Sequence, residues 1–169
     1  IPTQTDFNVH YPKLSTGTMS TTLPNGTEIV EMKDMKMYFL NGADIVDEHD
    51  ISSQTASVDK NQIIYNDIYP GVALSMSHNA RLRKMDYVID NLQALNLPDN
   101  ADYLVFEEKI ELPEDVTWIK KDGEILFMNA SGDYIFKYAA PAFRDQDSPT
   151  RIDFSSVDYE ISQVENKLV

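Results

Sequence analysis

Apolar and polar residues alternate along much of this chain with a period of two, which is the pattern of a β-strand with one buried face. The alternation comes in short segments, and turn-forming residues such as Pro113 and Asp122-Gly123 separate them. Short strands that recur about every 8–12 residues are typical of a sandwich or barrel. We therefore predict an all-β fold, an antiparallel β-sandwich of the jelly-roll or immunoglobulin type, with at most one short helix.

The predicted strands cover most of the chain after residue 27. They are residues 28–40, 62–68, 72–76, 81–89, 103–107, 109–112, 116–120, 124–128, 134–138 and 152–161. Leucines at 92, 95 and 97 are compatible with a short helical turn or an irregular crossover, which Pro98 ends. We expect residues 1–27 to be an extended leader strand and the acidic segment 43–60 to be a solvated loop. Since no repeat is visible, residues 1–169 are expected to form a single domain.

The first long strand contains an irregularity. Within residues 28–40, Val30 and Met32 are expected to share one face, and the alternation then resumes with a shifted phase after Asp34. A period of two that one residue interrupts indicates a β-bulge or a tight turn.

Charge and composition narrow the classes of function. The chain has 28 acidic and 14 basic residues, which give a formal net charge of −14. Such a surface repels nucleic-acid phosphates and anionic lipids, and no apolar run approaches the roughly 20 residues needed to cross a bilayer. We therefore expect neither nucleic-acid binding nor membrane insertion. Divalent cations and cationic proteins suit this surface better.

The chain contains no cysteine. This excludes disulfides, thiolate metal sites and cysteine nucleophiles together. The chain begins with Ile1 rather than methionine, and we expect it to be a processed or trimmed piece of a longer protein.

Three sequence blocks occur in a fixed order. They are YNDIYPGVAL (Tyr65–Leu74), LRKMDYVI (Leu82–Ile89) and the hairpin that starts at Asp122-Gly123 and leaves through APAFRD (Ala140–Asp145). Together they resemble the N-terminal regions of large secreted and wall-associated YD-repeat (Rhs-like) proteins and related bacterial surface proteins. The resemblance implies an extracellular β-domain without catalytic residues. Ala73 stands where that family usually has an aspartate.

Calcium is the candidate metal, because it takes six to eight oxygen ligands and aspartates cluster in two places. The first cluster consists of Asp145, Asp147 and Asp153, and the second lies in segment 44–50 with Asp44, Asp47, Glu48 and Asp50. Neither stretch fits the EF-hand loop pattern, so a solvated loop is the alternative for both. No cofactor is required by any motif.

Catalytic groups are sparse. His10, His49 and His78 lie far apart without metal-ligand spacing, and the chain lacks the G-x-S-x-G and phosphate-loop motifs. The acids of residues 107–115 can supply the two carboxylates of a glycosidase, or they can be an ordinary polar strand and turn. These acids are Glu107, Glu108, Glu111, Glu114 and Asp115.

Aromatic residues leave a second possibility open. Trp118 alternates with Val116, which favours packing in the core. Tyrosines at 65, 69, 103, 134 and 138 are either core partners or a platform for stacking on sugars.

We predict a non-catalytic structural, adhesive or partner-binding module of an extracellular or cell-surface bacterial protein. The partners would be protein modules of the same or neighbouring chains. The alternative is a carbohydrate-binding or carbohydrate-active β-sandwich module.

Overall fold

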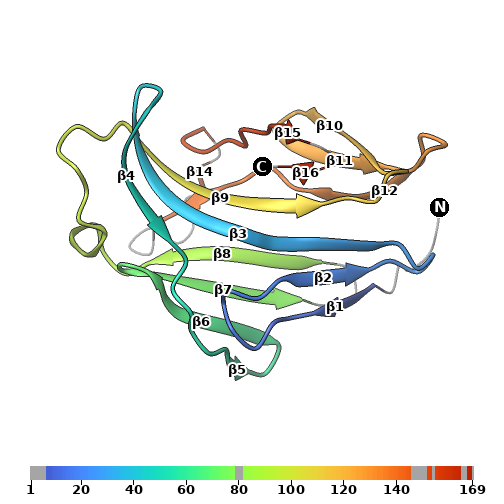
Figure 1. Ribbon diagram of the computed structural model, residues 1–169, viewed down its shortest axis with the longest axis horizontal. Coiled ribbons are helices and arrows are strands. Elements are labelled where there is room, and N and C mark those ends of the chain that lie inside the picture. The colour runs from blue at the N-terminus through green and yellow to red at the C-terminus, as the bar shows by residue number, and fades with distance from the viewer. Residues whose placement is uncertain (1–6, 79–81, 146–151, 154, 165–166, 169) are drawn as a thin grey trace. The chain divides into compact units, whose positions relative to one another are not determined.

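The computed structural model describes residues 7–78, 82–145, 152–153, 155–164 and 167–168. This part of the chain is all-β, antiparallel and sandwich-like, as the alternation predicted (Figure 1). Its one helical element is the short 3-10 turn η1 (Leu92–Leu95), which the leucines indicated. No helix among the described residues is long and apolar enough to cross a bilayer.

The chain divides into two compact units, Ile1–Glu111 (unit 1) and Leu112–Val169 (unit 2). That the whole chain folds as one domain stays a prediction.

Unit 1 contains two antiparallel sheets (Figure 1). The first sheet has the order β1 (Asn8–His10), β2 (Met19–Thr22), β3 (Glu28–Asn41) and β9 (Tyr103–Glu111), and β4 (Asp44–Asp50) also pairs with β3. The second sheet has the order β5 (Ser57–Asp59), β6 (Gln62–Tyr69), β7 (Val72–His78) and β8 (Arg83–Ile89).

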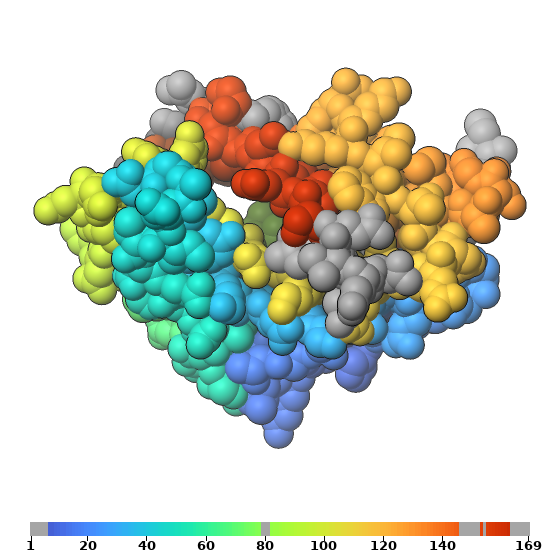
Figure 2. Space-filling view, turned by 45° about the horizontal axis from the view of Figure 1, so that its top comes forward, coloured from blue at the N-terminus to red at the C-terminus, as the bar shows by residue number. Residues whose placement is uncertain are grey.

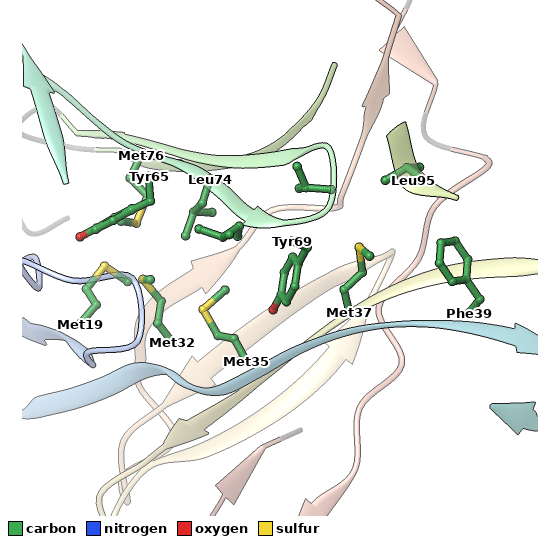
Figure 3. Close-up of a cluster of buried hydrophobic side chains, with 12 residues drawn as sticks. Met19, Met32, Met35, Met37, Phe39, Tyr65, Tyr69, Leu74, Met76 and Leu95 are labelled. Atoms are coloured by element: carbon green, nitrogen blue, oxygen red, sulfur yellow. The ribbon is translucent and has the colours of Figure 1, made fainter. Parts of the chain in front are cut away.

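The core of unit 1 lies between these sheets and is rich in methionine. Side chains from β2 and β3 point toward side chains from β6 and β7 (Figure 3). The most buried members of this cluster are Met19, Met32, Met35, Met37, Phe39, Tyr65, Ile68, Tyr69, Val72, Leu74, Met76 and Leu95. Because methionine is unbranched and flexible, it fills irregular gaps between two twisted sheets.

Two bulges in β3 decide which of its residues face this core. Met32 and Asp34 adopt positive φ angles of 58° and 48°, and the pairing with β9 shifts at both places. The sequence indicated one interruption at Asp34, and that prediction is confirmed. The expectation that Val30 and Met32 share one face is wrong, because Met32 is itself in a bulge. Glu31 is therefore buried beside Met32, while Val30 is only partly buried.

Segments 44–50 and 103–111 of unit 1 differ from the sequence prediction. Residues 44–50 form strand β4 rather than a loop, and β4 pairs with the C-terminal half of β3. The pairing is made by backbone groups, so it does not depend on the side chains of β4. The charged side chains of β4 lie at the surface of unit 1 (Figure 2, cyan). Residues 103–111 form one continuous strand instead of two.

Unit 2 contains a three-stranded antiparallel meander of β10 (Thr117–Lys121), β11 (Glu124–Met128) and β12 (Tyr134–Tyr138). Phe127 is fully buried and stacks on Phe136, with ring centroids 4.2 Å apart. Trp118 lies opposite Phe127 in the pairing of β10 with β11 and is partly buried, which agrees with the predicted packing role.

The remaining pairs of unit 2 are short. They are β13 (Phe143–Arg144) with β14 (Ile152–Asp153), and β15 (Gln163–Val164) with β16 (Lys167–Leu168). The predicted strand over 152–161 is wrong in length, since residues 155–161 are not in a strand. In that segment Asp153 accepts hydrogen bonds from two serines, which favours a turn.

Candidate functional site

A charged group is buried inside unit 1 between the two sheets. Arg83 on β8 contacts both carboxylate oxygens of Glu31 on β3, and its Nη1 atom lies 2.5 Å from Glu31 Oε2. Thr21 on β2 donates its hydroxyl to the same carboxylate at 2.9 Å and accepts from Arg83 Nη1 at 2.9 Å. Glu31 is only 2% exposed. Such a two-point contact is the strongest geometry available to an arginine and a carboxylate.

The bulges of β3 explain why an acid occupies this place. Met19 lies directly opposite Glu31 in the pairing of β2 with β3, and both residues are buried. Met32 follows Glu31 and adopts a left-handed backbone conformation. As a result, the successive side chains of Glu31 and Met32 are both buried instead of lying on opposite faces of the strand. Bulges commonly redirect a side chain next to a site.

A second acid, Glu108, lies beside this ion pair. It sits on β9 between Phe106, which packs against the core, and Ile110, which is buried. The Glu108 residue is only partly buried, but its Oε2 atom is shielded from solvent and has no hydrogen-bond partner. We call Thr21, Glu31, Arg83 and Glu108 the buried charge cluster.

The surroundings of Glu108 favour its protonated form. The pKa of the Glu108 carboxyl is raised to about 7, first by burial and then by the nearby Glu31 carboxylate. Arg83 and a hydrogen bond with the Met32 backbone act in the opposite direction. Arg83 already pairs with Glu31, so its charge stabilises ionised Glu108 only weakly. Desolvation therefore has the larger effect, and the pKa of Glu108 rises.

Two tyrosines complete the environment of Glu108. Tyr87 on β8 stacks on Phe106 with ring centroids 4.0 Å apart. Burial raises the pKa of the Tyr87 and Tyr69 hydroxyls, and Glu108 raises both further. The Tyr69 hydroxyl is buried and, like Glu108 Oε2, has no hydrogen-bond partner. Two unsatisfied polar atoms in one apolar interior are unusual and call for an explanation.

The three histidines are not brought together with acids into a metal site. Tyr11 contacts His78, with its hydroxyl 3.2 Å from His78 Nδ1. His49 lies 3.1 Å from Asp47 on β4, and His10 is exposed on β1. Among the residues that the structure describes, no three histidine, aspartate or glutamate side chains could hold one metal ion.

The predicted calcium ligands are only partly described. Asp145 is exposed just after β13, and Asp147 lies outside the described residues. Asp153 accepts hydrogen bonds from Ser155 and Ser156 at 2.7–2.8 Å, and these bonds lower its pKa. Calcium binding by these three aspartates stays a prediction.

The second calcium candidate, segment 44–50, is a strand in which neighbouring side chains alternate between faces. Glu48 forms an ion pair with Lys36 at 2.7 Å, and Asp47 contacts His49. Alternation along a strand separates adjacent carboxylates, whereas a calcium loop gathers them.

The other acids of the predicted carboxylate set either contact side chains of the neighbouring strand β3 or lie in a turn. Glu107 accepts a hydrogen bond from Tyr38 at 3.2 Å, and Glu111 forms an ion pair with Lys33. Glu114 and Asp115 are exposed in the turn before β10.

A shallow surface depression lies at η1. Leu92, Gln93, Asn96 and Leu97 line it. Leu92 is 62% exposed and Leu97 is 44% exposed. The segment protrudes from unit 1 (Figure 2, yellow-green).

Neither a family model, nor a curated protein, nor a solved structure matches this chain at a significant level. The resemblance to YD-repeat proteins therefore stays a prediction.

Glu108 is one of the five candidate acids of residues 107–115, but its position between the sheets was not predicted from the sequence. The signal was present, because Glu108 shares a face with Phe106 and Ile110 at a period of two. Glu31 and Arg83 were missed altogether. Only the exact position of a bulge tells which face Glu31 occupies.

Proposed function

We propose that the chain is a non-catalytic structural, adhesive or partner-binding β-module of a longer extracellular bacterial protein. The observation that carries this proposal is the position of the buried charge cluster. Arg83 and Glu31 join one sheet to the other, and the free oxygen of Glu108 is shielded from solvent. A catalytic acid must contact its substrate, so these groups suit a role in holding the sheets together.

The pairs on the solvent side of β9 support the same role. Glu111 pairs with Lys33, and Lys109 lies 2.9 Å from Asp34 on β3. These contacts fix the register of two central strands across the bulges. A rigid, register-fixed sandwich is a suitable spacer between modules.

Partners are expected to be protein modules that present basic residues, because the net charge of this chain is −14. The apolar depression at η1 supplies a surface for such contact. Leu92 and Leu97 are exposed there within an otherwise acidic chain. The extracellular setting is supported by the sequence resemblance alone.

A hydrolysis screen on polysaccharides and a glycan array test the non-catalytic part. We expect no turnover by the wild type. Turnover that disappears in Glu108→Gln but persists in Glu28→Gln would overturn the proposal, because Glu28 is exposed and is a matched control.

Co-elution with the neighbouring modules of the parent protein tests the partner-binding part. Leu92→Glu should weaken association, whereas Leu82→Glu, at a second exposed leucine, should not. Equal behaviour of the two variants would remove η1 from the proposed interface.

A carbohydrate-binding module is the second candidate, and exposed aromatic residues favour it. Tyr103 in unit 1 is 64% exposed and Tyr134 in unit 2 is 61% exposed. Aromatic faces that stay in water can stack on sugars. Binding on the array that is lost in Tyr103→Ala or Tyr134→Ala would favour this candidate.

A further inference from the structure

In the described part of unit 1, two acids and one cation lie close together between the sheets. Glu31 on β3 and Glu108 on β9 both belong to the first sheet, and Arg83 on β8 belongs to the second. Arg83 is engaged with Glu31 and Thr21. Ionised Glu108 would therefore add a negative charge to a region whose guanidinium already has a carboxylate partner.

Among the residues that the structure describes, the groups that face Glu108 from the surrounding strands include no cation other than Arg83. They are Glu31 from β3, Arg83 and Tyr87 from β8, and Tyr69 from β6. The Tyr69 hydroxyl and Glu108 Oε2 both lack a partner while they are shielded from solvent. A buried carboxylate in this position must attract Arg83 away from Glu31 or admit water between the sheets.

We propose that Glu108 and the Glu31–Arg83 pair form a proton-dependent lock between the two sheets of unit 1, closed when Glu108 is protonated and loosened when it ionises. The neutral carboxyl fits among Phe106, Tyr87 and Ile110 without a counter-ion. The ionised carboxyl competes for Arg83 and so weakens the one ion pair that joins β3 to β8 in the buried charge cluster. This inference does not depend on the proposed function.

The direction of the effect follows from proton linkage. The folded protein holds the Glu108 proton more tightly than the unfolded chain, whose glutamate has a pKa near 4.5, because its surroundings in the fold, chiefly burial, raise the pKa to about 7. Stability is therefore highest below about pH 4.5 as far as Glu108 is concerned. It falls as the pH rises to about 7 and then levels off.

Urea unfolding of unit 1, followed between pH 4.5 and 9, tests the lock. Other carboxylates also titrate in this range, so the informative quantity is the ratio of unfolding constants of wild type and Glu108→Gln. We expect this ratio to rise on the order of 100-fold from pH 4.5 to 8. The ratio between wild type and the exposed control Glu28→Gln should stay within about twofold. A ratio for Glu108→Gln that does not change with pH would overturn the proposal.

Hydrogen exchange locates the effect. Protection factors of β8 and β9, corrected for the intrinsic rate at each pH, should fall between pH 4.5 and about 7 in the wild type and then level off. They should not fall in Glu108→Gln. Equal pH dependence in both proteins would place the change elsewhere and overturn the lock.

A direct titration keeps the proposal testable if Glu108→Gln does not fold. The ¹³C chemical shift of the Glu108 carboxyl in the wild type should titrate with a midpoint near 7. A midpoint near 4.5 would show that the carboxyl ionises without resistance and would overturn the proposal.

Discussion

Arg83 and Glu31 form a two-point ion pair inside unit 1, with each residue on a different sheet. Glu31 is almost completely buried and the Arg83 side chain is 16% exposed. Breaking such a pair leaves a charge without compensation in a medium of low polarity. The pair therefore stabilises the sandwich mainly because neither partner can be lost alone.

Arg83→Met should reduce the free energy of unfolding of unit 1 by about 3–5 kcal/mol. The reason is that the Glu31 carboxylate would stay buried with only the Thr21 hydroxyl as a partner from this cluster. Urea denaturation measures the loss. Lys84→Met, which removes an exposed pair with Asp86, should cost less than about 1 kcal/mol.

The double variant Glu31→Met/Arg83→Met distinguishes two causes of destabilisation, an unpaired buried charge and the loss of side-chain packing. It should be more stable than Arg83→Met, because no charge is left unpaired. Equal stability of the single and double variants would contradict this explanation.

Gly71→Ala should destabilise unit 1 more than an ordinary glycine substitution in a turn. Gly71 has a φ of +70°, and an added Cβ would lie 2.4 Å from Ala94 Cβ. Gly26→Ala is the matched control, since Gly26 has a φ of +86° and open space around it. The control should cost about 1–2 kcal/mol from backbone strain alone.

Thermal unfolding compares the two glycine variants. The further variant Gly71→Ala/Ala94→Gly should recover part of the lost stability, because it removes the nearest clashing atom. Identical melting temperatures for Gly71→Ala and Gly26→Ala would show that the contact with Ala94 is unimportant.

Phe127→Ala should cost about 3–5 kcal/mol in the stability of unit 2, because Phe127 is fully buried. Phe136→Ala should cost less, since Phe136 is only partly buried although it stacks on Phe127. Trp118 is the single tryptophan and lies opposite Phe127, so its fluorescence reports unfolding of unit 2. Phe143→Ala, at a residue that is 51% exposed, is the control and should change stability by less than about 0.5 kcal/mol.

The fold class could be predicted because a period of two is a local property of the sequence. The strands around Phe127 and the turn at Asp122-Gly123 follow from alternation and turn chemistry, and both lie where they were expected. Strand β4 was missed because acidic residues suit a loop as well as a strand at the surface. Its pairing with β3 depends on a hairpin partner rather than on its own sequence.

The buried charge cluster could not be predicted in full, for a specific reason. A one-residue change in register moves every following side chain of a strand to the other face. The second bulge, at Met32, requires a left-handed conformation that methionine seldom adopts, so nothing in the sequence marks it. Glu108, in contrast, could have been placed in the interior from its spacing to Phe106 and Ile110.

Oxidation by dilute peroxide should distinguish the methionines by burial. Five of the seven are at most 2% exposed and belong to the core of unit 1, namely Met19, Met32, Met35, Met37 and Met76. Met85 and Met128 are partly exposed. We expect Met85 and Met128 to be oxidised first, and the five core residues only as fast as unit 1 opens, because a sulfoxide is polar and does not fit an apolar core. Peptide mass spectrometry measures each rate, and in urea all seven should react alike. Oxidation of Met35 as fast as Met128 in the native protein would contradict the burial described for β3, and with it the register on which the position of Glu31 depends.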